Sequence, residues 1–261
     1  MKLIINADDF GLTKGTNSAI VQAMKFGLVT STTLMLNQLG TEDAIDIIQT
    51  YDLANIGLHV NISSGKAVSN IEDIPDLVDE NGMFLGRRHL ANVCESISSH
   101  QVYLEAMNQY KLALSKGVNI SHVDSHHFAA FLPNLKRGFI EFANEVGLPT
   151  RRPDYYDQDL TSLTVLTPDQ FSGKFYAGRS NEEGFKQTIL ELKENNPRGT
   201  AEIMAHPAHC DLDLAAVSSY TAQRELELNI LTSPHIKQWL AEQGVELISF
   251  NDLPRNNHEE R

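Results

Sequence analysis

Two patterns of apolar and polar positions alternate along the chain. Short β-branched runs predict buried strands, whereas segments with apolar residues three or four apart predict amphipathic helices. The expected strands cover residues 3–7, 29–36, 56–61, 118–125, 201–205 and 245–250, with a short extended piece at 148–153. The expected helices cover residues 17–26, 41–50, 134–146, 182–194, 221–231 and 233–243, and one or two more lie within 90–116.

This alternation of strands and helices predicts an α/β fold. We expect a single domain over residues 1–261, a distorted (β/α) barrel of about seven strands. A doubly wound sheet is less favoured, because no glycine-rich dinucleotide fingerprint follows any strand. Residues 63–88 and 153–181 lack clear periodicity and are expected to be loop insertions, the first of them a lid or binding loop. The tail at 256–261 is expected to fray.

Acid or imidazole side chains stand where several of the apolar runs end. They are Asp8, Asp9, His59, His126 and His206. Because the carboxyl ends of parallel strands meet at one edge, we expect these side chains to gather there. Adjacent residues on a strand point to opposite faces, so two neighbouring carboxylates share a task only if the chain bends, as Gly11 would allow. The simpler alternatives are an ordinary Asp-Asp turn and isolated core histidines.

Together, His59, His126 and one of Asp8 or Asp9 offer one carboxylate and two imidazoles. This donor set suits Zn²⁺, Fe²⁺, Co²⁺ or Mn²⁺ with coordination positions left open for water. The pattern therefore indicates a catalytic metal site at the C-terminal edge of the barrel rather than a structural one.

Other histidines allow competing interpretations. His122 and His126 are four residues apart, but the zinc-protease helix with that spacing also needs a glutamate between them, which is absent. We therefore place both at a strand end, where Asp124 either hydrogen-bonds a ligand imidazole or has a structural role. His209 and Cys210 form a rival soft-metal cluster, which no second cysteine-containing cluster completes.

Charge and cysteine content restrict the partners and the compartment. The formal net charge of −13 disfavours nucleic-acid binding, which relies on Lys and Arg. Cys94 and Cys210 are too few for a disulfide framework, which favours a cytoplasmic location. Only a few apolar residues separate Lys2 from Asp8, so we expect neither a signal peptide nor a membrane span.

Several motifs resemble the YdjC-like carbohydrate deacetylases, which include chitooligosaccharide deacetylase. The motifs are Asn6-Ala-Asp-Asp-Phe-Gly, Val29-Thr-Ser-Thr-Thr, Gly57-Leu-His, His122-Val-Asp-Ser-His-His, His206-Pro-Ala and Leu231-Thr-Ser-Pro. The resemblance spans nearly the whole chain. It implies a distorted barrel and one divalent metal ion, Mg²⁺ or Zn²⁺ first and Co²⁺, Mn²⁺ or Fe²⁺ as alternatives. It also implies that Asp9, His59 and His126 are the metal ligands.

The same resemblance implies removal of the N-acetyl group from an acetylated amino sugar or short oligosaccharide, with release of acetate. It implies that Asp8 is the catalytic base, and it suggests that His206 and Arg151 are catalytic or supporting residues. His206 would protonate the departing amine, and Arg151 would hold Asp8 ionised unless it forms only a surface salt bridge. The alternatives are a phosphoesterase, disfavoured because few cations besides Arg151 and Arg152 stand near the motifs, and a non-catalytic sugar-binding protein.

Departures from the family pattern affect the expected substrate. Many relatives have further histidine and methionine where this chain has Phe128-Ala129-Ala130, and His209-Cys210 is also unusual. Aromatic residues cluster within 155–176, where they would stack on a sugar, pack the loop or form a subunit contact. They are Tyr155, Tyr156, Phe175 and Tyr176. Relatives make a homodimer plausible, and the sequence assigns no role to His127.

Overall fold

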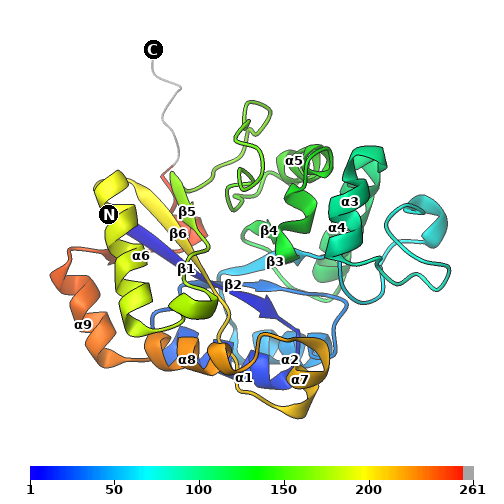
Figure 1. The fold of residues 1–261 in the computed structure, drawn as a ribbon. Coiled ribbons are helices and arrows are strands. Elements are labelled where there is room, and N and C mark those ends of the chain that lie inside the picture. Colours follow the sequence, from blue (N-terminus) through cyan, green and yellow to red (C-terminus); the bar gives the residue numbers. More distant parts are fainter. Residues whose placement is uncertain (255–261) are drawn as a thin grey trace.

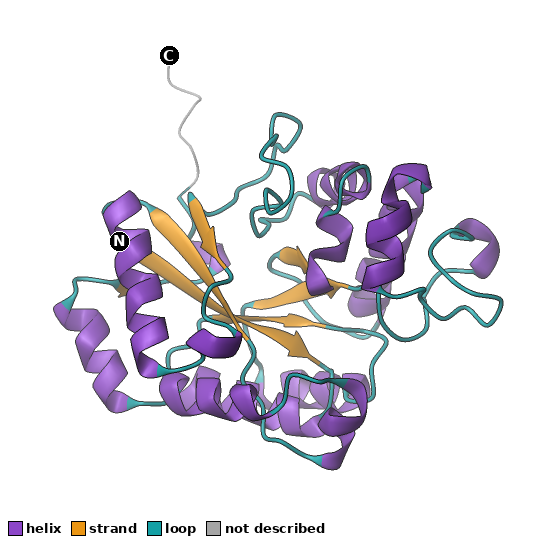
Figure 2. Cartoon of the chain, in the orientation of Figure 1, coloured by secondary structure: helices purple, strands orange, loops and turns teal. Residues whose placement is uncertain are grey.

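A curled sheet of seven parallel strands forms the centre of the computed structural model, which describes residues 1–254. The strand order is β4-β3-β2-β1-β6-β5, and β7 pairs with β1. Helices flank this half-barrel, whereas the loops between α5 and β5 extend from one end of it (Figures 1 and 2). The predicted distorted (β/α) barrel of about seven strands is confirmed.

The strands and helices have the following bounds. The strands are β1 (Lys2–Phe10), β2 (Ser31–Leu34), β3 (Ile56–Val60), β4 (Val123–Ser125), β5 (Gln170–Ser172), β6 (Thr200–Ala205) and β7 (Glu246–Leu247). The helices are α1 (Lys14–Phe26), α2 (Thr41–Tyr51), α3 (Arg87–Val93), α4 (Ser99–Ser115), α5 (Leu135–Val146), α6 (Glu182–Asn195), α7 (Leu212–Val217), α8 (Ala222–Leu231) and α9 (Pro234–Glu242). None of these helices combines the length and apolar character needed to cross a bilayer.

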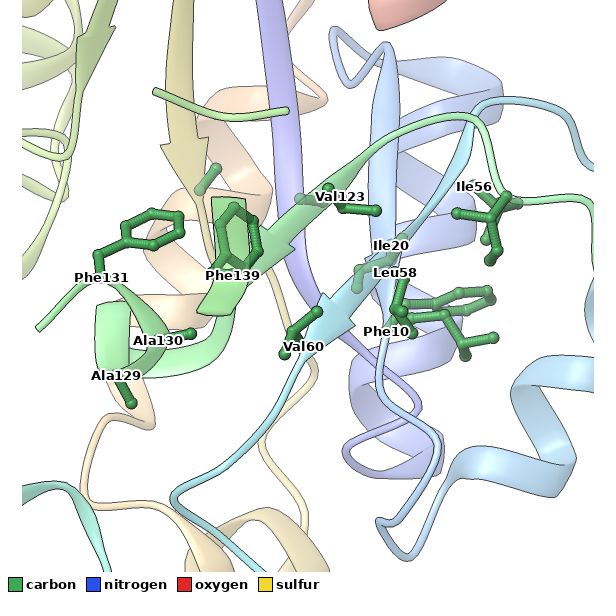
Figure 3. Close-up of a cluster of buried hydrophobic side chains, with 14 of the residues drawn as sticks. Phe10, Ile20, Ile56, Leu58, Val60, Val123, Ala129, Ala130, Phe131 and Phe139 are labelled. Atoms are coloured by element: carbon green, nitrogen blue, oxygen red, sulfur yellow. The ribbon is translucent and has the colours of Figure 1, made fainter. Parts of the chain in front are cut away.

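Strand β1 is the centre of the sheet because it pairs with β2, β6 and β7. All of its residues after Lys2 are buried, as the apolar run at its start predicts. Apolar side chains from β3, β4 and α5 complete the core around it, and Figure 3 shows Leu58, Val123 and Phe139 in this cluster. The ends of the central strands are thereby held in fixed positions.

Besides β5, which the sequence does not predict, three elements differ from the sequence-based expectation. The segment 118–125 forms a strand only at its last three residues. The expected final strand 245–250 is reduced to β7, because Ser249 and Asp252 form a capping box that begins a 3-10 turn at Phe250–Asp252. The short helix α7 was not expected.

The two predicted insertions are ordered segments. Residues 63–88 contain a 3-10 turn at Ile71–Asp73, and the buried Glu105 of α4 accepts the main-chain N–H groups of Val68 and Ser69 at 3.0 and 2.9 Å. The segment 153–181 includes β5, so part of it belongs to the sheet. That both segments are insertions stays a prediction, and the tail at 256–261 lies outside the described residues.

Candidate metal centre and active site

The end of β1 bends where the two aspartates lie. Asp9 has a φ of 71°, and the pairing of β1 with β2 shifts register between Ala7 and Phe10. A positive φ costs a non-glycine residue about 1–3 kcal/mol. Gly11 also has a positive φ of 95°, and a Cβ there would lie 2.6 Å from the main-chain oxygen of Met35. The bend predicted from Gly11 therefore begins at Asp9 itself, and both carboxylates line one cavity.

Three side-chain atoms from β1, β3 and the turn after β4 converge at this bend. Oδ1 of Asp9 lies 3.4 Å from Nε2 of His59 and 3.0 Å from Nδ1 of His126, and the two nitrogens are 3.2 Å apart. All three side chains are buried, and Oδ1 of Asp9 has no hydrogen-bond partner. A buried carboxylate oxygen left unpaired between two imidazole nitrogens fits a divalent cation with nitrogen and oxygen ligands.

Asp124 sets the tautomer of the first histidine. Nδ1 of His59 donates to Oδ1 of Asp124 at 2.6 Å, which leaves Nε2 facing Asp9 and His126. Burial alone would lower the pKa of His59, but Asp124 and the other nearby carboxylates outweigh it and raise the pKa to about 10. A cation bound at Nε2 therefore has to replace a proton there.

Arg151 occupies both oxygens of the other aspartate. Its Nη1 and Nη2 donate to Oδ2 and Oδ1 of Asp8, each at 2.7 Å, and its Nε donates to Glu202 at 2.7 Å. Nη1 also lies 3.0 Å from Oδ2 of Asp124. Burial would raise the pKa of Asp8, but Arg151 outweighs burial and lowers it to about 2. Because Arg151 is completely buried, the alternative of a surface salt bridge is wrong.

His122 is not among the three side chains that converge on Oδ1 of Asp9, and it contacts Asp8 only through Asn6. Its Nε2 donates to Oδ1 of Asn6 at 3.1 Å, and Asn6 donates from Nδ2 to Asp8 at 2.8 Å. The ring stacks on Phe250 at 3.9 Å between centroids, and burial holds its pKa well below the ordinary value. His122 thus acts as a neutral hydrogen-bond donor in the core.

Arg224 on α8 contacts Asp9, and the sequence interpretation missed it. Its Nη2 donates to Oδ2 of Asp9 at 2.7 Å. Burial would raise the pKa of Asp9, but Arg224 and His126 outweigh it and hold the pKa well below its usual range. No sequence signal separates Arg224 from its exposed neighbour Glu225 on a charged helix. Since Arg151 uses both oxygens of Asp8 and Arg224 only one of Asp9, Asp9 fits the ligand role better.

His206, directly after β6, lines the same cavity. Its Nδ1 is buried without a partner, and burial lowers the pKa of the ring to about 4. Its main-chain N–H donates to Oε2 of Glu227 on α8 at 2.5 Å. Oε1 of Glu227 accepts the hydroxyls of Tyr220 and, at 3.1 Å, Ser180, and burial raises the pKa of this glutamate to about 7. Glu227 therefore connects the loop after β6, which carries His206, with the loops that carry Ser180 and Tyr220.

The cavity above these groups has a volume of about 840 Å³. Two aromatic pairs line it: Phe128 stacks on Tyr155 at 4.5 Å, and Tyr176 stacks on Tyr220 at 4.2 Å between ring centroids. Phe128 reaches the cavity because His127 and Phe128 have successive positive φ values of 57° and 53°. The size falls within the range of about 300–1,000 Å³ that is typical of small-molecule sites.

The aromatic residues expected in segment 155–176 have different surroundings. Tyr155 and Tyr176 line the cavity. Phe175 is completely buried and packs against Phe185, so it is a core residue. Tyr156 instead accepts a hydrogen bond from Arg87.

Only two groups of side chains within residues 1–254 have metal-compatible geometry. One is Asp9, His59 and His126, and the other combines Asp8, His59 and Asp124. Arg151 already neutralises the second group. Neither group includes His209 or Cys210, so the rival soft-metal cluster is wrong within the described chain.

Known proteins match this chain in sequence and in structure. Residues 2–242 match the family described as YdjC-like protein. Two proteins named carbohydrate deacetylase, from Thermoanaerobacter pseudethanolicus and Brevibacillus brevis, are 35% and 34% identical, covering 96% and 97% of this chain and 98% and 100% of their own lengths.

Solved structures agree with the sequence match. A putative cellobiose-phosphate cleavage protein from Enterococcus faecalis is 31% identical with a TM-score of 0.88, covering 97% of this chain and 99% of its own. A lactam utilization protein from Thermus thermophilus has a TM-score of 0.54 at 16% identity over 95% of this chain and all of its own, which supports the fold alone. Because these matches cover nearly the whole chain, it belongs to the YdjC-like protein family.

Proposed function

We propose that this protein is a metal-dependent hydrolase that removes the acetyl group from an N-acetylated amino sugar or short oligosaccharide and releases acetate. The observation that carries the proposal is the convergence of Asp9 Oδ1, His59 Nε2 and His126 Nδ1 beneath a cavity of about 840 Å³. Relatives named carbohydrate deacetylase support the choice of substrate class.

Asp9, His59 and His126 would hold the cation. Two imidazoles and a carboxylate suit Zn²⁺ better than Mg²⁺, which prefers oxygen ligands, so we propose Zn²⁺ or a similar transition metal before Mg²⁺. When bound, such a cation acidifies water and polarises the acyl oxygen of an amide.

Asp8 and His206 would move the protons. Asp8 is held ionised by Arg151 and accepts a proton from the attacking water. His206 then protonates the amine nitrogen as its bond to the acyl carbon breaks. Because burial lowers the pKa of His206 to about 4, its ring is neutral before substrate binds. The proton that it donates to the amine is then the one that Asp8 takes from water.

Acetate release from N-acetylglucosamine oligomers, with and without a chelator, tests the proposal. We expect chelation to abolish activity in the wild type. Asp8→Asn should lower kcat by about 10²–10⁴-fold and leave the cation bound. The control is Asp46→Asn, the same change at an exposed position on α2.

Two outcomes would contradict the proposed hydrolysis. Acetate release that survives both chelation and Asp8→Asn would reject the metal-dependent mechanism. Cation binding without acetate release would favour a non-catalytic sugar-binding protein, or a phosphoesterase if an aryl phosphate were hydrolysed instead. The expected cytoplasmic location and homodimer stay predictions.

A further inference from the structure

Asp8 and Asp9 differ in how many of their carboxylate oxygens an arginine binds. Arg151 uses both oxygens of Asp8, whereas Arg224 donates only to Oδ2 of Asp9, at 2.7 Å. Oδ1 of Asp9 is the oxygen that faces His59 and His126. The orientation of the carboxylate plane, and with it the oxygen presented to the histidines, is therefore set by one guanidinium.

That guanidinium is itself held in place. Nε of Arg224 donates to the main-chain oxygen of Tyr220 at 2.9 Å, and the guanidinium carbon lies 5.6 Å from the centre of the Tyr220 ring. The side chain is 5% exposed, and Nη1 is buried without a partner. Arg224 has little freedom to release Asp9 and turn towards water.

We propose that Arg224 is a positioning residue for the metal ligand Asp9. By holding Oδ2, it aims Oδ1 at the two histidines and makes Asp9 a one-oxygen ligand. A carboxylate that binds a cation through one oxygen leaves more coordination positions for water and the acyl oxygen than one that binds through two. The inference rests on the proposed metal site.

The loss of Arg224 would change metal affinity in opposite directions, depending on whether its charge or its positioning of Asp9 matters more. A cationic side chain close to Asp9 repels a second cation, so removing its charge alone would tighten metal binding. Removing a hydrogen bond that orients a ligand typically weakens metal affinity by about 10–100-fold. The sign of the change in affinity therefore distinguishes the two roles.

Titration of the metal-free full chain with Zn²⁺ alone, followed by calorimetry, measures this sign. We expect Arg224→Met to weaken Zn²⁺ binding by about 10–100-fold. Arg224→Lys keeps the charge but lacks the planar fork, so it should bind Zn²⁺ more weakly than the wild type and more tightly than Arg224→Met. Arg137→Met is the matched control at an exposed position on α5 and should bind as the wild type does.

A second comparison tests whether Arg224 affects metal binding through Asp9. In an Asp9→Asn background, adding Arg224→Met should weaken Zn²⁺ binding no further, because the oriented ligand is already gone. Unchanged or tighter binding by Arg224→Met overturns the positioning role. If Arg224→Met does not fold, wild-type affinity in Arg224→Lys overturns it instead. If the wild type binds no Zn²⁺, Mn²⁺ or Co²⁺, the metal site of the proposed function fails as well.

Discussion

The candidate site has two halves that are built differently. On the strand side, Asp8 of β1, Asp124 of β4 and Glu202 of β6 surround the completely buried Arg151, which directly follows the bridge between Thr150 and Val123. On the helix side, residues of α8 hold groups that lie at strand ends. Arg224 holds Asp9, and Glu227, less than one turn further along, holds the main chain of His206.

The difference lies in how the charges are balanced. Three carboxylates share one guanidinium on the strand side, and burial raises the pKa of Glu202 to about 7 there. On the helix side, Arg224 has a single carboxylate partner, and Glu227 accepts hydrogen bonds from hydroxyl and main-chain N–H donors. The strand side therefore depends on one shared guanidinium, whereas the helix side depends on several separate hydrogen bonds.

The largest expected effect comes from removing the shared cation. Arg151→Met leaves three buried carboxylates without their partner, so the free energy of unfolding should fall by about 3–5 kcal/mol. Urea unfolding at pH 7 in chelator measures this, with Arg137→Met as the control. An equal or larger loss for Arg224→Met would break the comparison between the two halves.

A smaller effect is expected from pH on the helix side. The pKa of Glu227 is about 7 in the folded protein against an ordinary value of 4.5. Between these values the folded state keeps a proton that the unfolded chain has lost, so stability falls as pH rises through this window. The loss amounts to about 3 kcal/mol and is complete above pH 7.

Glu227→Gln, which resembles the protonated form, should remove the part of this dependence that Glu227 contributes and leave the part that comes from Glu202. The variant should therefore gain stability relative to the wild type between pH 4.5 and pH 8, as measured by urea unfolding across that range. Equal pH slopes for the two proteins would show that Glu227 does not titrate in the window. Glu242→Gln, at the end of α9, serves as a control.

The smallest effect is expected from a single hydroxyl. Tyr220→Phe keeps the ring that stacks on Tyr176 but removes the donor to Glu227, so stability should fall by about 1 kcal/mol. Denaturant unfolding of the variant gives this value. A loss as large as that of Arg151→Met would mean that the helix side also depends on one central contact.

Much of the strand side could be predicted from sequence. Asp8, His59 and His206 follow apolar runs, and the carboxyl ends of parallel strands meet at one edge whatever their distance in sequence. The position of these residues after apolar runs therefore predicts that their side chains lie near each other. The positive φ of Asp9 could not be predicted, because a bend near a glycine does not reveal which residue adopts the positive φ.

The helix side could not be predicted in the same way. Arg224 and Glu227 lie on a helix with many polar residues, and only the elements packed against α8 decide that these two are buried. Strand β5 was missed for a related reason, since its three residues form a strand by pairing with the edge of β6. Tertiary contacts, not local pattern, specify these parts.

Strand β1 pairs with three other strands and carries both aspartates at its end. Amide protons in such a central strand exchange with solvent only when the whole domain opens. We therefore expect Ile4 and Ile5 to be among the slowest-exchanging amides of the chain. Fraying at the edge strands would leave the carboxylates in place, so the site should be lost only when the domain unfolds as a whole.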